Sequence, residues 1–390
     1  MEKTLYHVWL FFLGLVYYLI VPAIVAASKI WENYPGIDLL YSYYKDEYLF
    51  GYFSLILLIA IPYIIGAYLP VFCYKKISRP IHQIIISSKG LFIISIPMLL
   101  YSQYVIVANR GYMFQGYLAE IDVPFVGTLA TVNMVVLFLF IYNKLGDYSK
   151  TINKLLAFIL IELCVVVLGL GTRMYVMVTI FSLFVFLLDQ KIVTIKKMLL
   201  WLSLIVVLVL AVGIWRMGGS HISYEQMMYI GVAEPTFTWI SAISMYDLNE
   251  LPLLAFPSNF ISSFINFIPS SLLPDKSELI SELSLNYYSP FGATSVLLSL
   301  ISNFGILGSM IALFCLGFLL TQIRLRWLTV FGQSYYYCVC GIIPFQLFRD
   351  DMGIVNKQII SNLLLVPIIF FTVHRIMSLL ATRIDKAPTS

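Results

Sequence analysis

Four arginines stand at the ends of apolar runs, where a guanidinium group can bind an anion. They are Arg110 in ANRGY, Arg173 in GTRMYV, Arg216 in WRMGGSH and Arg349 in FRDD. If these runs cross a membrane, all four arginines emerge on the extracytoplasmic side, although basic residues normally collect on the cytoplasmic side. A planar guanidinium binds two phosphate oxygens at once. The four arginines therefore predict a site for a phosphorylated ligand, with lipid headgroup contact or a local ion pair as the alternatives.

Acidic residues and one histidine near these arginines are candidate general bases. His221 and Glu234 lie in the segment after the third arginine, and Asp350 and Asp351 directly follow the fourth. A base must lie within hydrogen-bond reach of the hydroxyl whose proton it takes. Our candidates for the general base are His221, Asp351 and Glu234, of which His221 and Asp351 are preferred. We expect Asp350 to take part in substrate binding. The alternative for each is a solvated loop charge.

The composition shows which elements must position these residues. The chain has 390 residues, of which 61% are hydrophobic and 11% charged, and its mean hydropathy is +0.91. These values exclude a soluble globular domain of ordinary composition. Runs long enough to cross a bilayer as helices of about 20 residues lie near residues 5–27, 49–74, 90–108, 124–142, 155–172, 174–188, 198–215, 294–320, 328–348 and 354–373. We predict one all-α polytopic membrane domain over residues 1–390, with about ten transmembrane helices.

The distribution of basic residues predicts the orientation. With both termini in the cytoplasm, the termini and the loops at 75–89, 143–154, 189–197 and 321–327 hold 16 of the 24 Lys and Arg residues. Such a bias is typical of cytoplasmic loops. The net charge of +4 therefore reflects membrane topology, and we expect no nucleic acid partner.

One connection is much longer than the others and lies on the extracytoplasmic side. It covers residues 216–293 and contains six prolines. A loop of this length is usually functional. We expect a helix at 225–246 on or in the membrane interface, interrupted at Pro235, and a re-entrant or surface segment at 254–273. Together these short helices would roof a cavity.

Three further features have competing interpretations. Glu162 falls within a predicted span, so it is either a hydrogen-bonded structural residue, a functional group, or one end of a proton path in a transporter. Tyr41, Tyr43, Tyr44 and Tyr48 in the first outer loop, and Tyr287 and Tyr288 in the long one, belong to the interfacial aromatic belt or stack on sugar rings. The chain has no nucleotide-binding glycine motif, metal-spaced cluster or nucleophile elbow, so we expect no cofactor and a metal-independent reaction.

The layout resembles a known family. A short GTR hairpin, one long outer loop, a following span FGATSVLLSLISNFGILG and a late outer arginine in FRDD are similar to the Wzy-type O-antigen and capsule repeat-unit polymerases of bacteria. The resemblance implies an all-helical, GT-C-like glycosyltransferase related to the O-antigen ligases. It implies that Arg173, Arg216 and Arg349, and less surely Arg110, hold the diphosphates of undecaprenyl-linked oligosaccharides at the outer face of the cytoplasmic membrane.

The resemblance also implies a flippase and a chain-length regulator as partners. Two alternative functions stay open. An O-antigen ligase would use the same donor with another acceptor. A flippase or transporter of lipid-linked sugar would place charges along a path through the bundle.

Overall fold

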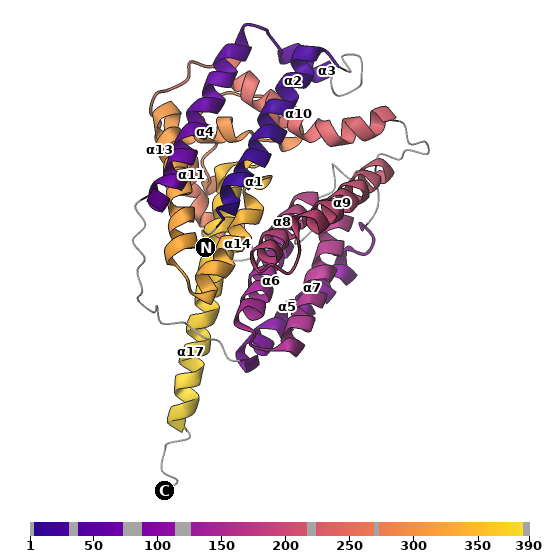
Figure 1. Ribbon diagram of the computed structural model, residues 1–390, viewed down its shortest axis with the longest axis vertical. Coiled ribbons are helices and arrows are strands. Elements are labelled where there is room, and N and C mark those ends of the chain that lie inside the picture. Colours follow the sequence, from indigo (N-terminus) through magenta and orange to yellow (C-terminus); the bar gives the residue numbers. More distant parts are fainter. Residues whose placement is uncertain are drawn as a thin grey trace.

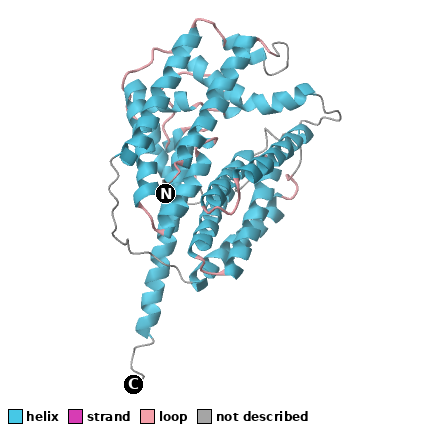
Figure 2. Cartoon of the chain, viewed as in Figure 1, coloured by secondary structure: helices cyan, strands magenta, loops and turns pink. Residues whose placement is uncertain are grey.

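A computed structural model describes residues 4–30, 38–72, 88–113, 126–216, 224–268 and 273–384 of the chain. Within these ranges the regular secondary structure is helical and no strand occurs (Figure 2). Seven helices are long and apolar enough to cross a membrane: Tyr6–Ser28, Tyr48–Phe72, Phe92–Asn109, Gly127–Gly146, Lys150–Gly169, Val296–Arg326 and Met352–Ile376. The prediction of an all-α chain with several membrane-spanning helices is confirmed to this extent.

All ten predicted apolar runs are helical over most of their described residues, because a backbone in hydrocarbon must satisfy its own polar groups. The seven candidate spans contain α1 (Tyr6–Leu15), the π-helical turn η1 (Val16–Ile20), α2 (Val21–Ser28), α4 (Tyr48–Phe72), α5 (Ser88–Asn109), α6 (Val126–Gly146), α7 (Lys150–Gly169), α13 (Val296–Arg326), α16 (Met352–Asn356), the π-helix η4 (Lys357–Leu365) and α17 (Val366–Ile384). The other three runs form α8 (Arg173–Asp189), α9 (Ile195–Arg216) and α14 (Val330–Ile342).

The helices form two groups that α14 joins. Helices α5 to α9 lie together on one side, and α1, α2, α4, α10 (Tyr224–Leu248) and α13 lie on the other (Figure 1). Helix α14 contacts α8 and α6 in the first group and α13 and α1 in the second. The two groups also contact each other directly where α9 packs on α10. The first group carries Arg173 and the second carries Glu234, so the packing around α14 and between α9 and α10 sets how these residues are placed.

Two glycines let α4 and α13 touch along their backbones. A Cβ atom at Gly66 would lie 2.1 Å from the carbonyl oxygen of Phe314, and one at Gly317 would lie 2.4 Å from that of Tyr63. Small residues that allow such close approach are a common means of helix association in membranes.

Helix α10, in the long connection, runs unbroken through Pro235, and the predicted interruption there is wrong. Proline has no N–H to donate to the carbonyl four residues earlier, which is that of Gly231. The hydroxyl of Tyr17 donates to this carbonyl at 2.8 Å instead. Tyr17 belongs to η1, so the proline creates a contact between the first span and α10. Helix α10 also buries Trp239 and is therefore part of the core.

The described rest of the long connection contains short helices between irregular stretches, as predicted, and packs on α13. These are α11 (Ser258–Ser262), η2 (Ser263–Phe267), α12 (Lys276–Leu279) and η3 (Pro290–Gly292). The N–H of Phe260 donates to Asn303 Oδ1 at 2.8 Å. Further along, the N–H of Ile306 donates to the carbonyl of Pro252 at 2.9 Å. The latter bond lies at a kink in α13, where Gly305 has a φ of 71°.

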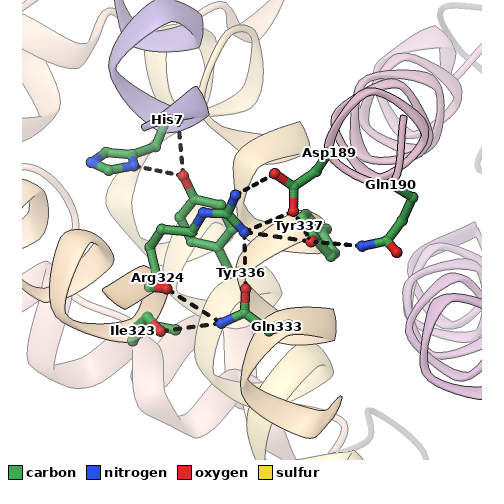
Figure 3. Close-up of polar contacts among 8 residues, drawn as sticks. All are labelled: His7, Asp189, Gln190, Ile323, Arg324, Gln333, Tyr336 and Tyr337. Atoms are coloured by element: carbon green, nitrogen blue, oxygen red, sulfur yellow. Dashed lines mark hydrogen bonds and ion pairs between the residues drawn. The ribbon is translucent and has the colours of Figure 1, made fainter. Parts of the chain in front are cut away.

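A buried ion pair joins the two helix groups at the end of α13 (Figure 3). Arg324 is 2% exposed and forms a bidentate ion pair with Asp189, at the end of α8. Its Nη1 also donates to Gln333 Oε1 at 2.9 Å, and the hydroxyl of Tyr337 donates to the same Asp189 carboxylate. The sequence predicts a loop at 321–327. The loop prediction is wrong for most of this stretch, because α13 continues to Arg326 and places the Arg324 side chain inside the bundle.

We expect Tyr17→Phe to destabilise the protein by about 1 kcal/mol, because it leaves the Gly231 carbonyl without a donor. Adding Pro235→Ala should recover most of this loss, since alanine supplies the backbone N–H that proline lacks. Thermal melting of the purified protein in detergent measures both effects. If the double variant loses at least as much stability as the two single variants lose together, the account of this contact is contradicted.

Arg324→Ala should cost about 3–5 kcal/mol, because it leaves Asp189 without its buried partner. Arg326→Ala, two residues away at an exposed position, is the matched control and should melt like the wild type. Changing both Arg324 and Asp189 to alanine should melt above Arg324→Ala alone. Equal melting of the two arginine variants would show that the buried pair does not stabilise the bundle.

Candidate functional site

The second charge cluster is centred on Arg349, where α10 meets the short helix α15 (Gln346–Arg349). The Nε atom of Arg349 lies 2.7 Å from Glu234 Oε1, and its Nη1 donates to Asp350 Oδ1 at 2.7 Å. Glu234 is half-buried, whereas Asp350 is only 7% exposed. The guanidinium thus sits between two carboxylates from different parts of the chain.

Burial and ion pairing oppose each other in this cluster. Burial raises the pKa of Asp350 above its ordinary value, and the neighbouring Arg349 guanidinium counteracts that rise. For Arg349 itself burial acts against the charged form, but Asp350 and Glu234 outweigh it and raise the pKa. Arg349 therefore stays protonated and holds both carboxylates in place.

Arg173 approaches the same cluster from the other helix group. It begins α8 directly after a tight turn in which Gly171 has a φ of 86°. Its Nη1 lies 3.4 Å from the position that a Cβ atom would occupy at Gly213, on α9. Among the described residues, no carboxylate lies within ion-pair distance of Arg173. Its charge is therefore not neutralised by any ion pair that the structure describes.

Three tyrosines connect these charged residues. Tyr17 lies within electrostatic range of both Glu234 and Arg173. Tyr18 lies within range of Glu234 and Arg349, and Tyr175, near the start of α8, is within range of Arg349. Two arginines and two carboxylates thus gather around aromatic side chains from α8 and η1.

This group combines two chemical capacities. Glu234 is a carboxylate accessible enough to accept a proton from a bound hydroxyl, and Arg349 fixes its orientation. Arg173 is a cation that can bind an anion close by. A base and an anion site in one partly dry location are what group transfer from a phosphorylated donor requires.

The structure brings three of the residues singled out from the sequence into contact, namely Arg349, Glu234 and Asp350. Arg173 lies within electrostatic range of Tyr17, as Glu234 does. Asp351 has a structural contact instead, because its Oδ1 accepts a hydrogen bond from the N–H of Ile354 at 2.8 Å and caps α16.

The other predicted site residues lie apart or cannot be placed. Arg110 is exposed beyond the end of α5, and no described contact links it to Arg349. His221 lies outside the described residues. Arg216 ends α9, one turn after Gly213, and its side chain is outside the described part.

Sequence reasoning missed Tyr17, Tyr18 and Tyr175. A signal for them existed, since a tyrosine in an apolar span needs a partner for its hydroxyl. The freed carbonyl four residues before Pro235 is such a partner, but only the fold shows that Tyr17 reaches it.

Glu162 is separate from this group. Its carboxylate accepts hydrogen bonds from Ser102 Oγ, at 3.0 Å, and from Gln103 Nε2, both on α5. This is the hydrogen-bonded arrangement that we gave as its structural interpretation.

Comparisons of the chain with models of protein families, with curated proteins and with solved structures found no match in any of the three. The site must therefore be interpreted from its own geometry.

We expect Arg349→Met to lower the melting temperature at pH 7 and to lower it less at pH 5. Without the guanidinium the pKa of Asp350 rises further. A buried acid with a raised pKa binds its proton more tightly in the folded state, so the penalty is present above the folded pKa and is relieved as the pH falls.

Adding Asp350→Asn to Arg349→Met removes the buried acid and should flatten this pH dependence. Thermal melts at several pH values test both statements. A loss that is constant with pH in the single variant would show that Asp350 is not the group left unpaired.

Proposed function

We propose that this chain is a glycosyltransferase that joins undecaprenyl diphosphate-linked oligosaccharide repeat units at the outer face of the bacterial cytoplasmic membrane. The observation that carries the proposal is that Glu234, held by Arg349, and Arg173, which has no described ion pair, both lie within electrostatic range of the same tyrosine, Tyr17. The resemblance of the sequence layout to the Wzy-type polymerases supports it. In this proposal all ten apolar helices cross the membrane in a GT-C-like arrangement, with both termini in the cytoplasm.

The proposed reaction uses these residues in distinct roles. Glu234 takes the proton of an acceptor sugar hydroxyl, and the hydroxyl oxygen attacks the anomeric carbon of the donor. The bond from that carbon to the diphosphate breaks, and the diphosphate leaves with the electron pair. Negative charge grows on the leaving diphosphate, so a fixed cation stabilises the transition state more than the ground state.

Arg173 is the proposed ligand of that diphosphate. Arg216 is proposed to add a second cation, because it ends the helix that carries Gly213, against which Arg173 lies. Arg349 acts as a positioning residue for Glu234, with Asp350 as its buried counter-ion. This division gives Arg349 a different role from the diphosphate contact that the family resemblance implied.

Complementation tests the proposal. In a strain that lacks its repeat-unit polymerase, the wild-type gene should restore long-chain polysaccharide. Arg173→Ala and Glu234→Gln should each slow turnover by about a hundredfold or more, by analogy with the loss of one transition-state contact. They should therefore abolish the ladder at unchanged protein level. Lys29→Gln, at an exposed position beyond α2, is the control and should leave the ladder intact.

The same experiment separates the alternative functions. Long chains that persist in both Arg173→Ala and Glu234→Gln would contradict the proposed site. Repeat units that accumulate on the carrier lipid without transfer to the lipopolysaccharide core, in a knockout of the native gene, would indicate a ligase. Repeat units trapped on the cytoplasmic side in that knockout would indicate a flippase.

A further inference from the structure

A short segment of the long connection, residues 284–288, is held by hydrogen bonds at both ends, although Asn286, Tyr287 and Tyr288 are exposed. At one end, the N–H of Ser284 donates to Ser302 Oγ at 2.7 Å, and its hydroxyl donates to the carbonyl of Ser302 at 2.8 Å. Ser302 belongs to the buried first half of α13. This end of the segment is therefore fixed to the core.

The other end of the segment is bonded to α10 and to Asn249, the residue that follows it. The N–H of Asn286 donates to Asn249 Oδ1 at 3.1 Å, and Asn249 Nδ2 donates back to the carbonyl of Asn286 at 2.8 Å. The N–H of Tyr288 donates to Ser244 Oγ at 2.9 Å. The backbone N–H groups of residues 284, 286 and 288 thus donate hydrogen bonds to α13, to Asn249 and to α10, respectively.

Two large aromatic rings project from this fixed segment. Tyr287 is 37% exposed and Tyr288 is 43% exposed. Tyr288 stacks on Tyr43, with ring centroids 5.5 Å apart and planes 18° apart. Tyr287 has no such ring partner among the described contacts. Rigid exposed aromatics of this kind bind ligands at low entropic cost.

Two carboxylates lie within electrostatic range of the Tyr287 hydroxyl. Partial burial raises the pKa of its hydroxyl, and the neighbouring Asp351 and Glu282 raise it further. Asp351 follows the Arg349 cluster by two residues. The carbonyl of Arg349 also accepts a hydrogen bond from the N–H of Thr294 at 2.9 Å. The aromatic segment itself is bonded to α10, the helix that also carries Glu234.

These neighbours decide which ligand the ring suits. A membrane-interface tyrosine would meet lipid phosphates, but two carboxylates repel phosphate. A neutral sugar fits both features, because its C–H face packs on an aromatic ring and its hydroxyls donate to carboxylate oxygens. The chemistry of the surface thus favours a glycan over a lipid headgroup.

We propose that Tyr287, flanked by Asp351 and Glu282, is a carbohydrate-binding platform that holds the glycan of a lipid-linked substrate next to the Glu234 site. That the glycan is carried on a lipid diphosphate rests on the function proposed above. The platform itself rests on the fixed segment, the exposed ring and the two carboxylates. It assigns Tyr287 to glycan recognition and leaves diphosphate binding to the arginines.

Binding measurements on the full-length protein in nanodiscs test this assignment. The probes are undecaprenyl diphosphate and the same lipid carrying the repeat-unit oligosaccharide of the host strain. The wild type should bind the glycosylated lipid about tenfold more tightly, as expected for one stacking contact with associated hydrogen bonds. Tyr287→Ala should lose this preference and keep its affinity for the bare lipid, whereas Tyr287→Phe should keep most of the preference.

Tyr68→Ala is the matched control, because Tyr68 is 41% exposed and lies on the candidate span α4. It should bind both lipids like the wild type. Asp351→Asn together with Glu282→Gln should weaken the preference while leaving the ring in place. A wild type without preference for the glycosylated lipid, or a Tyr287→Ala variant that retains it, would overturn the platform.

Free oligosaccharide released from the lipid separates failure of the platform from failure of the proposed function. If the wild type binds neither lipid, the proposed function is overturned. Saturation-transfer NMR with the free oligosaccharide then tests whether the platform binds a glycan, independently of the lipid. Transfer from the wild type that is absent from Tyr287→Ala supports it, and no transfer from either protein overturns it.

Discussion

The structure depends on one constraint: inside a bilayer no water is available to satisfy polar groups, so the chain must pair them itself. This constraint makes the apolar runs helical, and it also explains their irregular points. Where Pro235 removes a backbone donor, the hydroxyl of Tyr17 supplies one. Where α13 turns Arg324 inward, Asp189, Gln333 and Tyr337 surround the charge. Each departure from a simple apolar helix thus creates a contact between helices.

These contacts also assemble the candidate site. Helix α8 has Arg173 at one end and Asp189 at the other, which places the two charge clusters about 24 Å apart along a helix that rises 1.5 Å per residue. The buried pair at one end fixes α8 against α13. The same helix begins with Arg173, which lies within electrostatic range of Tyr17, as Glu234 does. The stabilising ion pair of Asp189 and the proposed functional cation, Arg173, therefore lie at the two ends of the same helix.

The second cluster is nearly balanced in charge, which makes it tolerable in a partly buried location. Arg349 is paired with both Glu234 and Asp350, and Arg173 lies within electrostatic range of Tyr17, as Glu234 does. Arg349 is therefore better suited to hold a base than to bind an anion by itself. Arg173 has no described ion pair, so in the proposed function it is the cation available to a diphosphate. In the same proposal the long connection contributes an aromatic surface through Tyr287.

The sequence alone determined the fold class, because twenty-residue apolar runs admit no soluble structure and favour helices in a bilayer. It also determined the length of the segment at 216–293 and singled out Arg173, Glu234, Arg349 and Asp350 as residues of interest. It did not determine which of them meet, since Glu234 and Arg349 are more than a hundred residues apart. The tertiary structure alone decided that they pair, that Arg324 is buried and that α10 continues through Pro235. The physical reason is that the sequence shows where a buried charge or a proline leaves a polar group in need of a partner. Which residue becomes that partner depends on how helices distant in the sequence pack together.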